Sequence, residues 1–98
     1  MANEPATPDD VLRALANIHR LRILHALSDG ALWVSDLQAL LPLSQSALSQ
    51  HLARLREAGI VATHRQGLAV AYRIVDAEAL TLAEGLLRLV DRREKLQP

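Results

Sequence analysis

The chain has 98 residues and a formal net charge of zero, which fits one small domain with a modest core. Half of the residues are apolar but only two are aromatic, so the core must consist of aliphatic side chains, which favours helices. Because there is no cysteine, disulfides, thiol nucleophiles and thiolate metal sites are excluded for these residues.

No apolar run approaches the roughly 20 residues that a membrane span needs, and the N-terminal residues MANEPATPDD lack the features of a signal peptide. We therefore expect a single domain over residues 1–98 that acts in the cytoplasm without a membrane segment.

The charges are unevenly distributed along the chain. Residues 1–10 carry three acids and no base, whereas residues 43–75 carry Arg54, Arg56, Arg65 and Arg73 against Glu57. Such a basic middle is typical of a nucleic-acid-binding face on a neutral protein, but a solvated surface would look the same.

Four helices are predicted in the first 59 residues. Thr7 or Asp9 caps the first, which ends near Asn17, and leucines at three- and four-residue spacing predict the second over residues 18–28. The third spans residues 34–41 with a capping box of Ser35 and Gln38, and Pro42 ends it. A short turn then leads to a fourth helix, capped by Ser44 and ended at Gly59. This is a helix-turn-helix arrangement.

After Gly59 the period changes to that of strands. Leu68, Val70, Tyr72 and Ile74 alternate with smaller or polar residues, and a Gln66-Gly67 turn predicts a two-stranded hairpin. A last helix, capped by Asp76, runs to about residue 95. Its apolar residues cover about half of its circumference, so we expect it to bury a second face against a partner chain.

The fourth helix presents an unusual outer face. With its leucines turned to the core, Ser46 and Gln50 point outward and Ser49 and Arg54 lie on the flanks. Short neutral hydrogen-bonding side chains let a helix enter the DNA major groove, and Arg54 and Arg56 can approach phosphates. The alternative is that these residues are only solvated.

The runs ALANIHRLRILHAL (residues 14–27) and LSQSALSQHLARLREAGIVATHRQG (residues 43–67) resemble the ArsR/SmtB family of bacterial winged-helix repressors. The resemblance implies a mainly α winged helix-turn-helix with a β-hairpin wing, and a homodimer formed through the first and last helices. At these helices we expect Leu12, Leu82, Leu86 and Leu89 in the dimer interface. The DNA contacts implied by position are Gln45, Ser46, Ser49, Gln50, His51 and Arg65, with His51 partly packed.

The sensor sites of the family are not matched. Where members that sense metals read ELCVCDL, residues 31–37 read ALWVSDL, and the last helix has no histidine for a zinc site. The sequence is most similar to the branch that senses sulfide or oxidants through two cysteines, and His25 stands where one of them would be. We therefore expect no metal, no cofactor and no cysteine-based switch. A small-molecule inducer remains possible, with Trp33 either as its contact or as core packing.

The predicted function is a dimeric transcriptional repressor that binds double-stranded DNA at an inverted-repeat operator. The alternative is a winged-helix protein-interaction module without DNA binding. We do not expect an enzyme, because no catalytic set, glycine-rich phosphate loop or metal cluster is visible in the sequence.

Overall fold

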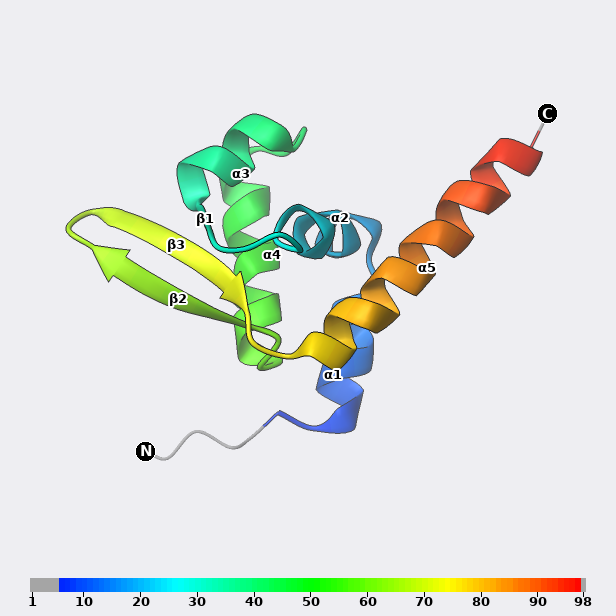
Figure 1. Ribbon diagram of the computed structural model, residues 1–98, viewed down its shortest axis with the longest axis horizontal. Coiled ribbons are helices and arrows are strands. Elements are labelled where there is room, and N and C mark those ends of the chain that lie inside the picture. Colours follow the sequence, from blue (N-terminus) through cyan, green and yellow to red (C-terminus); the bar gives the residue numbers. More distant parts are fainter. Residues whose placement is uncertain (1–5, 98) are drawn as a thin grey trace.

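A computed structural model describes residues 6–97, and residues 1–5 and 98 of the expected domain lie outside the described residues. The order of elements confirms the predicted winged helix-turn-helix, with one additional short strand (Figure 1). The elements are α1 (Pro8–Leu15), α2 (Ile18–Ala26), β1 (Leu32–Trp33), α3 (Val34–Leu40), α4 (Gln45–Glu57), β2 (Val61–Gln66), β3 (Ala69–Ile74) and α5 (Ala77–Leu96).

Side-chain caps begin most of the helices where the sequence predicts. Thr7 and Asp10 form a reciprocal capping box at α1, and Asn17 accepts hydrogen bonds from the backbone amides at the start of α2. Asp76 accepts the amide N–H of Ala79 at 3.1 Å at the start of α5. These caps satisfy helix amides that have no partner inside the helix, so the ends of these helices are fixed locally.

The cap of α3 differs from the predicted one. The backbone N–H of Trp33 donates to the carboxylate of Asp36 at 3.1 Å, so Trp33 is the N-cap residue and Ser35 lies inside the helix. Gln38 instead donates to the carbonyl of Leu43 at 2.6 Å and fastens the turn between α3 and α4. The predicted Ser35–Gln38 capping box is therefore wrong by two residues. The carboxylate of Asp36, which lies nearer the start of the helix than Gln38, accepts the N–H of the N-cap residue.

The core is mainly aliphatic, as the composition requires, and α2 and α4 supply most of its largest fully buried side chains. The large side chains that are almost completely buried come from α2, α3 and α4, from the residue after α2 and from the residue before β2: Ile23, Leu24, Leu27, Leu37, Leu48, Leu52, Leu55 and Ile60. The hairpin and the far end of α5 extend from opposite sides of this helical body (Figure 1). The winged end and the α5 end are thus separate surfaces.

The sheet has three strands in the order β1-β3-β2, not the two that the sequence predicts. Leu32 pairs with Tyr72 and Trp33 with Ala71, so the chain before α3 adds a short edge strand. Gly67 has a φ of +62°, and the hairpin turn consists of Gly67 and Leu68. In a two-residue hairpin turn whose first residue has a positive φ, the second residue, here Leu68, lies at the tip of the hairpin. Leu68 is therefore fully exposed, and its predicted burial in the strand is wrong.

α5 buries one stripe and leaves another exposed. Ala79, Ala83 and Leu87 pack into the core, whereas Leu82, Leu86 and Leu89 are 57%, 38% and 40% exposed.

Within residues 6–97, no helix is both long enough and apolar enough to cross a membrane.

Candidate nucleic-acid interface

α4 is held by its leucine face and presents a neutral face to solvent. Leu48, Leu52 and Leu55 are at most 1% exposed, which fixes the rotation of the helix about its axis. Ser44 caps the first turn by accepting the N–H of Ala47 at 3.1 Å. The side chains predicted to contact DNA in its first half are all exposed: Gln45, Ser46, Ser49 and Gln50. The structure thus brings them together on one solvent-facing ridge, which we call the α4 ridge.

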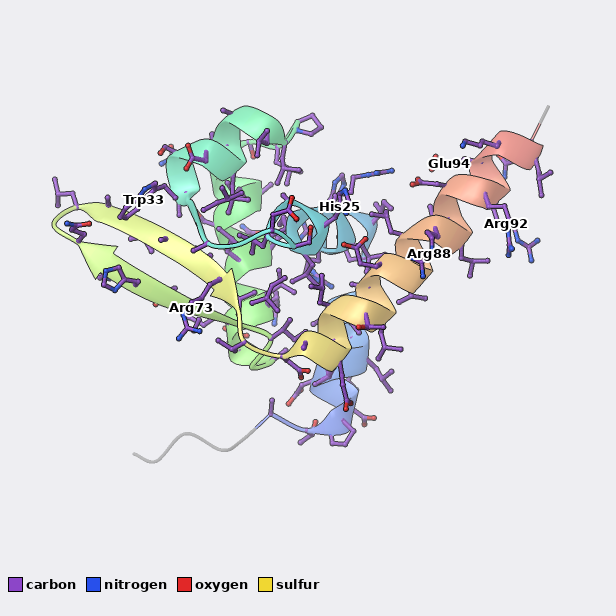
Figure 2. The ribbon with its side chains drawn as sticks, viewed as in Figure 1. His25, Trp33, Arg73, Arg88, Arg92 and Glu94 are labelled. Carbon is purple, nitrogen blue, oxygen red and sulfur yellow. The ribbon has the colours of Figure 1, made fainter. Side chains whose placement is uncertain are left out.

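A cleft of about 550 Å³ separates this helix from the hairpin. We call it the hairpin cleft. Ser49 and Arg56 line it from α4, and Arg65 lines it from β2. Trp33, for which the sequence leaves inducer contact and core packing open, forms part of the wall on the hairpin side, where Figure 2 shows it beside β3. Two guanidinium groups therefore flank the cleft beside the α4 ridge.

His51 lies on the other flank of α4 and is partly packed, as predicted. Its Nδ1 atom is 3.3 Å from Nη1 of Arg20, and its ring centroid is 5.6 Å from that of His19. Because arginine can only donate, Nδ1 accepts and the neutral ring carries its proton on Nε2. Burial, followed by the charges of Arg20 and His19, lowers the pKa of His51, so these neighbours favour the neutral ring.

Arg20 is a neighbour of the interface that the sequence reasoning missed. Its Nε atom donates to the carbonyl of Ala14 at 2.7 Å, and Nη2 donates to that of Arg13 at 3.0 Å. These bonds satisfy carbonyls at the end of α1, and the contact with His51 links α2 to α4. His51 is 31 residues from Arg20 in the sequence, so no local pattern could reveal the contact between them.

An apolar groove of about 500 Å³ lies between α1, the start of α2 and α5. We call it the α1–α5 groove. Leu12, which is 64% exposed, lines it together with Leu82 and Leu86. Leu89 is exposed on α5 but is not among the residues that line the groove. Three of the four predicted dimer residues therefore share one apolar depression.

A hydrogen-bonding contact and an ion pair join α2 to α5. His25 lies between the two helices (Figure 2), and its Nδ1 atom is 3.0 and 3.1 Å from the carboxylate oxygens of Glu84. Arg22 is 3.4 Å from Asp91. In the described part of the chain, no three histidine, aspartate or glutamate side chains are grouped to hold a metal ion.

Comparison with known proteins places these features in a family. The model of "bacterial regulatory protein, arsR family" matches residues 19–63, which include α2 to the start of β2. The transcriptional activator HlyU of Vibrio cholerae is 47% identical over 79 residues, covering 81% of this chain and 73% of that protein. The chain belongs to the arsR family. A second arsR-family relative, the biofilm growth-associated repressor of Xylella fastidiosa, is 35% identical over 94 residues, covering 96% of this chain and 80% of that protein.

Solved arsR-family structures agree with this assignment. The chain resembles the transcriptional repressor BigR from Xylella fastidiosa with a TM-score of 0.74, at 33% identity over 83% of each chain. It resembles HlyU from Vibrio cholerae with a TM-score of 0.73, at 46% identity over 83% of this chain and 88% of that chain. The protein is thus a winged-helix transcriptional regulator of the arsR family, and a winged-helix module without DNA binding is not favoured.

Proposed function

We propose that this regulator is a homodimeric repressor that binds an inverted-repeat operator in double-stranded DNA through α4 and the hairpin. The α4 ridge carries the proposal, because it combines uncharged hydrogen-bonding side chains with exposure to solvent. Gln45, Ser46, Ser49 and Gln50 contact base edges, and Arg54 and Arg65 contact phosphates. His51 donates from Nε2 to the backbone.

The dimer forms through the α1–α5 groove, which no side chain of residues 6–97 fills. Leu12, Leu82 and Leu86 of two copies cover each other there, and Leu89 packs at the margin of the contact. A two-fold dimer presents two α4 helices to half-sites about one helical turn, roughly 34 Å, apart. Its action on DNA is consistent with the cytoplasmic location expected from the sequence.

Repression requires only that the dimer occupy its operator and exclude other proteins from it. The relatives include one named an activator and one named a repressor. We favour repression for this chain because repression needs no surface beyond those that bind DNA and form the dimer. An inducer would have to act without cysteine chemistry, since none of the 98 residues is a cysteine. As a regulator that acts through binding, the protein is not an enzyme.

The test is DNA binding by variants that place a negative charge on the α4 ridge. Ser46→Glu and Ser49→Glu should each abolish binding to a fragment from upstream of the protein's own gene, because carboxylates repel phosphates and base acceptors. Thr81→Glu adds the same charge at an exposed position on α5 and should bind like the parent protein. Circular dichroism checks that all three are folded.

Binding by the parent protein should weaken steeply as salt is raised, because phosphate contacts release counterions. If the ridge variants bind DNA as well as Thr81→Glu does, the ridge does not read DNA. If the parent protein binds no duplex even at low salt, the chain is an interaction module instead.

A further inference from the structure

A second cleft, of about 600 Å³, lies on the side of α4 away from the hairpin. It is formed by α1, α2 and the C-terminal half of α4, and we call it the arginine cleft. Arg13, Arg20 and Arg54 line it, one from each of these helices, together with the carboxylates of Asp10 and Glu57. Three guanidinium groups from separate parts of the sequence therefore converge on one polar depression.

The two carboxylates do not neutralise this cluster tightly. Asp10 is engaged by Thr7, whose backbone N–H donates to its Oδ2 at 2.9 Å. Glu57 is 3.8 Å from Arg54, and both side chains are about two-thirds exposed, at 65% and 71%. Because an exposed ion pair of this geometry is weak, Arg54 can readily leave Glu57 for another anion. The cleft keeps an excess of positive charge.

Arg20 is the fixed element of the cleft. Its three contacts, to the carbonyls of Ala14 and Arg13 and to His51, use three of the five N–H groups of a guanidinium, so two remain. Among residues 6–97, no carboxylate forms an ion pair with Arg20. Burial and then the charge of Arg54 lower its pKa, so positive charge is already crowded here. An anion would relieve that repulsion without any rearrangement of Arg20.

The position of the cleft indicates which anion. Arg54 and Arg56 are two residues apart on α4 and thus about 160° apart around the helix. Arg56 lines the hairpin cleft and Arg54 lines the arginine cleft, with Ser46 and Gln50 of the α4 ridge between them around the helix. A helix about 10–12 Å in diameter fills a major groove about 12 Å wide, so phosphates of the two strands lie along both of its flanks.

We propose that the arginine cleft binds a phosphate of the DNA backbone across the major groove from the phosphate held at the hairpin cleft. The proposal rests on the DNA-binding function argued above and adds Arg13 and Arg20 to the contact residues. Arg20 supplies a fixed donor, and Arg13 and Arg54, both exposed, close on the phosphate from either side. The contact positions α4 in the groove and carries no sequence information.

The test compares double variants that remove the same charge from two places. Arg13→Gln with Arg54→Gln removes the mobile arginines of the cleft and leaves Arg20 and its contacts intact. Arg88→Gln with Arg92→Gln is the control, because both residues are exposed on α5, where Figure 2 shows them far from the hairpin. Arg54→Lys keeps the charge and should bind DNA like the parent protein. Circular dichroism verifies the fold of each variant.

The measurement is fluorescence anisotropy with a labelled mixed-sequence duplex of about 30 base pairs, long enough for two half-sites about ten base pairs apart. For the cleft variant, the slope of log affinity against log salt should fall by about one per protomer, and affinity at about 50 mM salt should fall at least tenfold. The α5 control should keep the parent slope.

Equal slopes for the cleft variant and the α5 control would overturn the proposal while leaving DNA binding by α4 in place. A parent protein that binds no duplex would overturn both. In a separate arm, inorganic phosphate is compared with chloride at equal ionic strength for its effect on thermal unfolding. Stabilisation of the parent but not the cleft variant, together with unchanged DNA slopes, would assign the cleft to a free anion and overturn its role on DNA.

Discussion

Leu12 offers the sharpest test of the proposed dimer, because its side chain is 64% exposed in the single chain and lies in the α1–α5 groove. Leu40 on α3 is 63% exposed and does not line that groove. Changing either leucine to glutamate should therefore lower the stability of the isolated chain by about the same amount. Only Leu12→Glu should disturb the association of two chains.

The magnitude follows from the exposed fraction. Full burial of a leucine stabilises by about 1.5–3 kcal/mol, so covering the exposed part of Leu12 contributes about 1–2 kcal/mol per copy. A two-fold interface contains both copies, which gives about 2–4 kcal/mol, or a roughly thirtyfold to several-hundredfold rise in the dimer dissociation constant. A buried unpaired carboxylate would add to this loss.

Sedimentation equilibrium over a range of protein concentrations measures the dissociation constant, and thermal unfolding checks that both variants fold. We expect Leu40→Glu to remain a dimer and Leu12→Glu to be a folded monomer at the same concentration. Indistinguishable dissociation constants for the two variants would refute the assignment of the groove to the dimer interface.

Three further predictions concern the fold and its dependence on pH. Leu55→Ala removes a side chain with no exposed area and should lower the free energy of unfolding by about 2–5 kcal/mol in urea; a loss below about 1 kcal/mol would contradict its place in the core. Gly59→Ala should cost about 1–2 kcal/mol because its φ is +75°, whereas Gly85→Ala, inside α5, should stabilise by up to about 1 kcal/mol. Because the pKa of His51 is lowered on folding, the unfolded chain binds its proton more readily, and the stability due to this group is lost as pH falls through about 6.5. Unfolding in urea at about pH 7.5 and 5.5 should therefore show a smaller loss of stability in His51→Gln, and an equal loss would contradict this sign.

The exposed face of α4 was largely visible in the sequence. The leucine spacing of α4 determines which side is buried, so the exposure of Ser46, Ser49 and Gln50 follows from a period of 3.6 residues. The sequence could not reveal the arginine cleft, because Arg20 reaches His51 across 31 residues. That contact depends on how α1, α2 and α4 pack, which no local pattern encodes.

What the sequence determined by itself were the features whose causes are local. Caps such as Ser44 and Asp76, the helix end at Gly59 and the change of period after it depend on hydrogen bonds and dihedral angles within a few residues. Only the tertiary structure decided the pairing of Leu32 with Tyr72 and the apolar depression that Leu12 shares with α5. Strand pairing and surface shape arise between segments distant in the chain, where the packing of the whole core selects one arrangement.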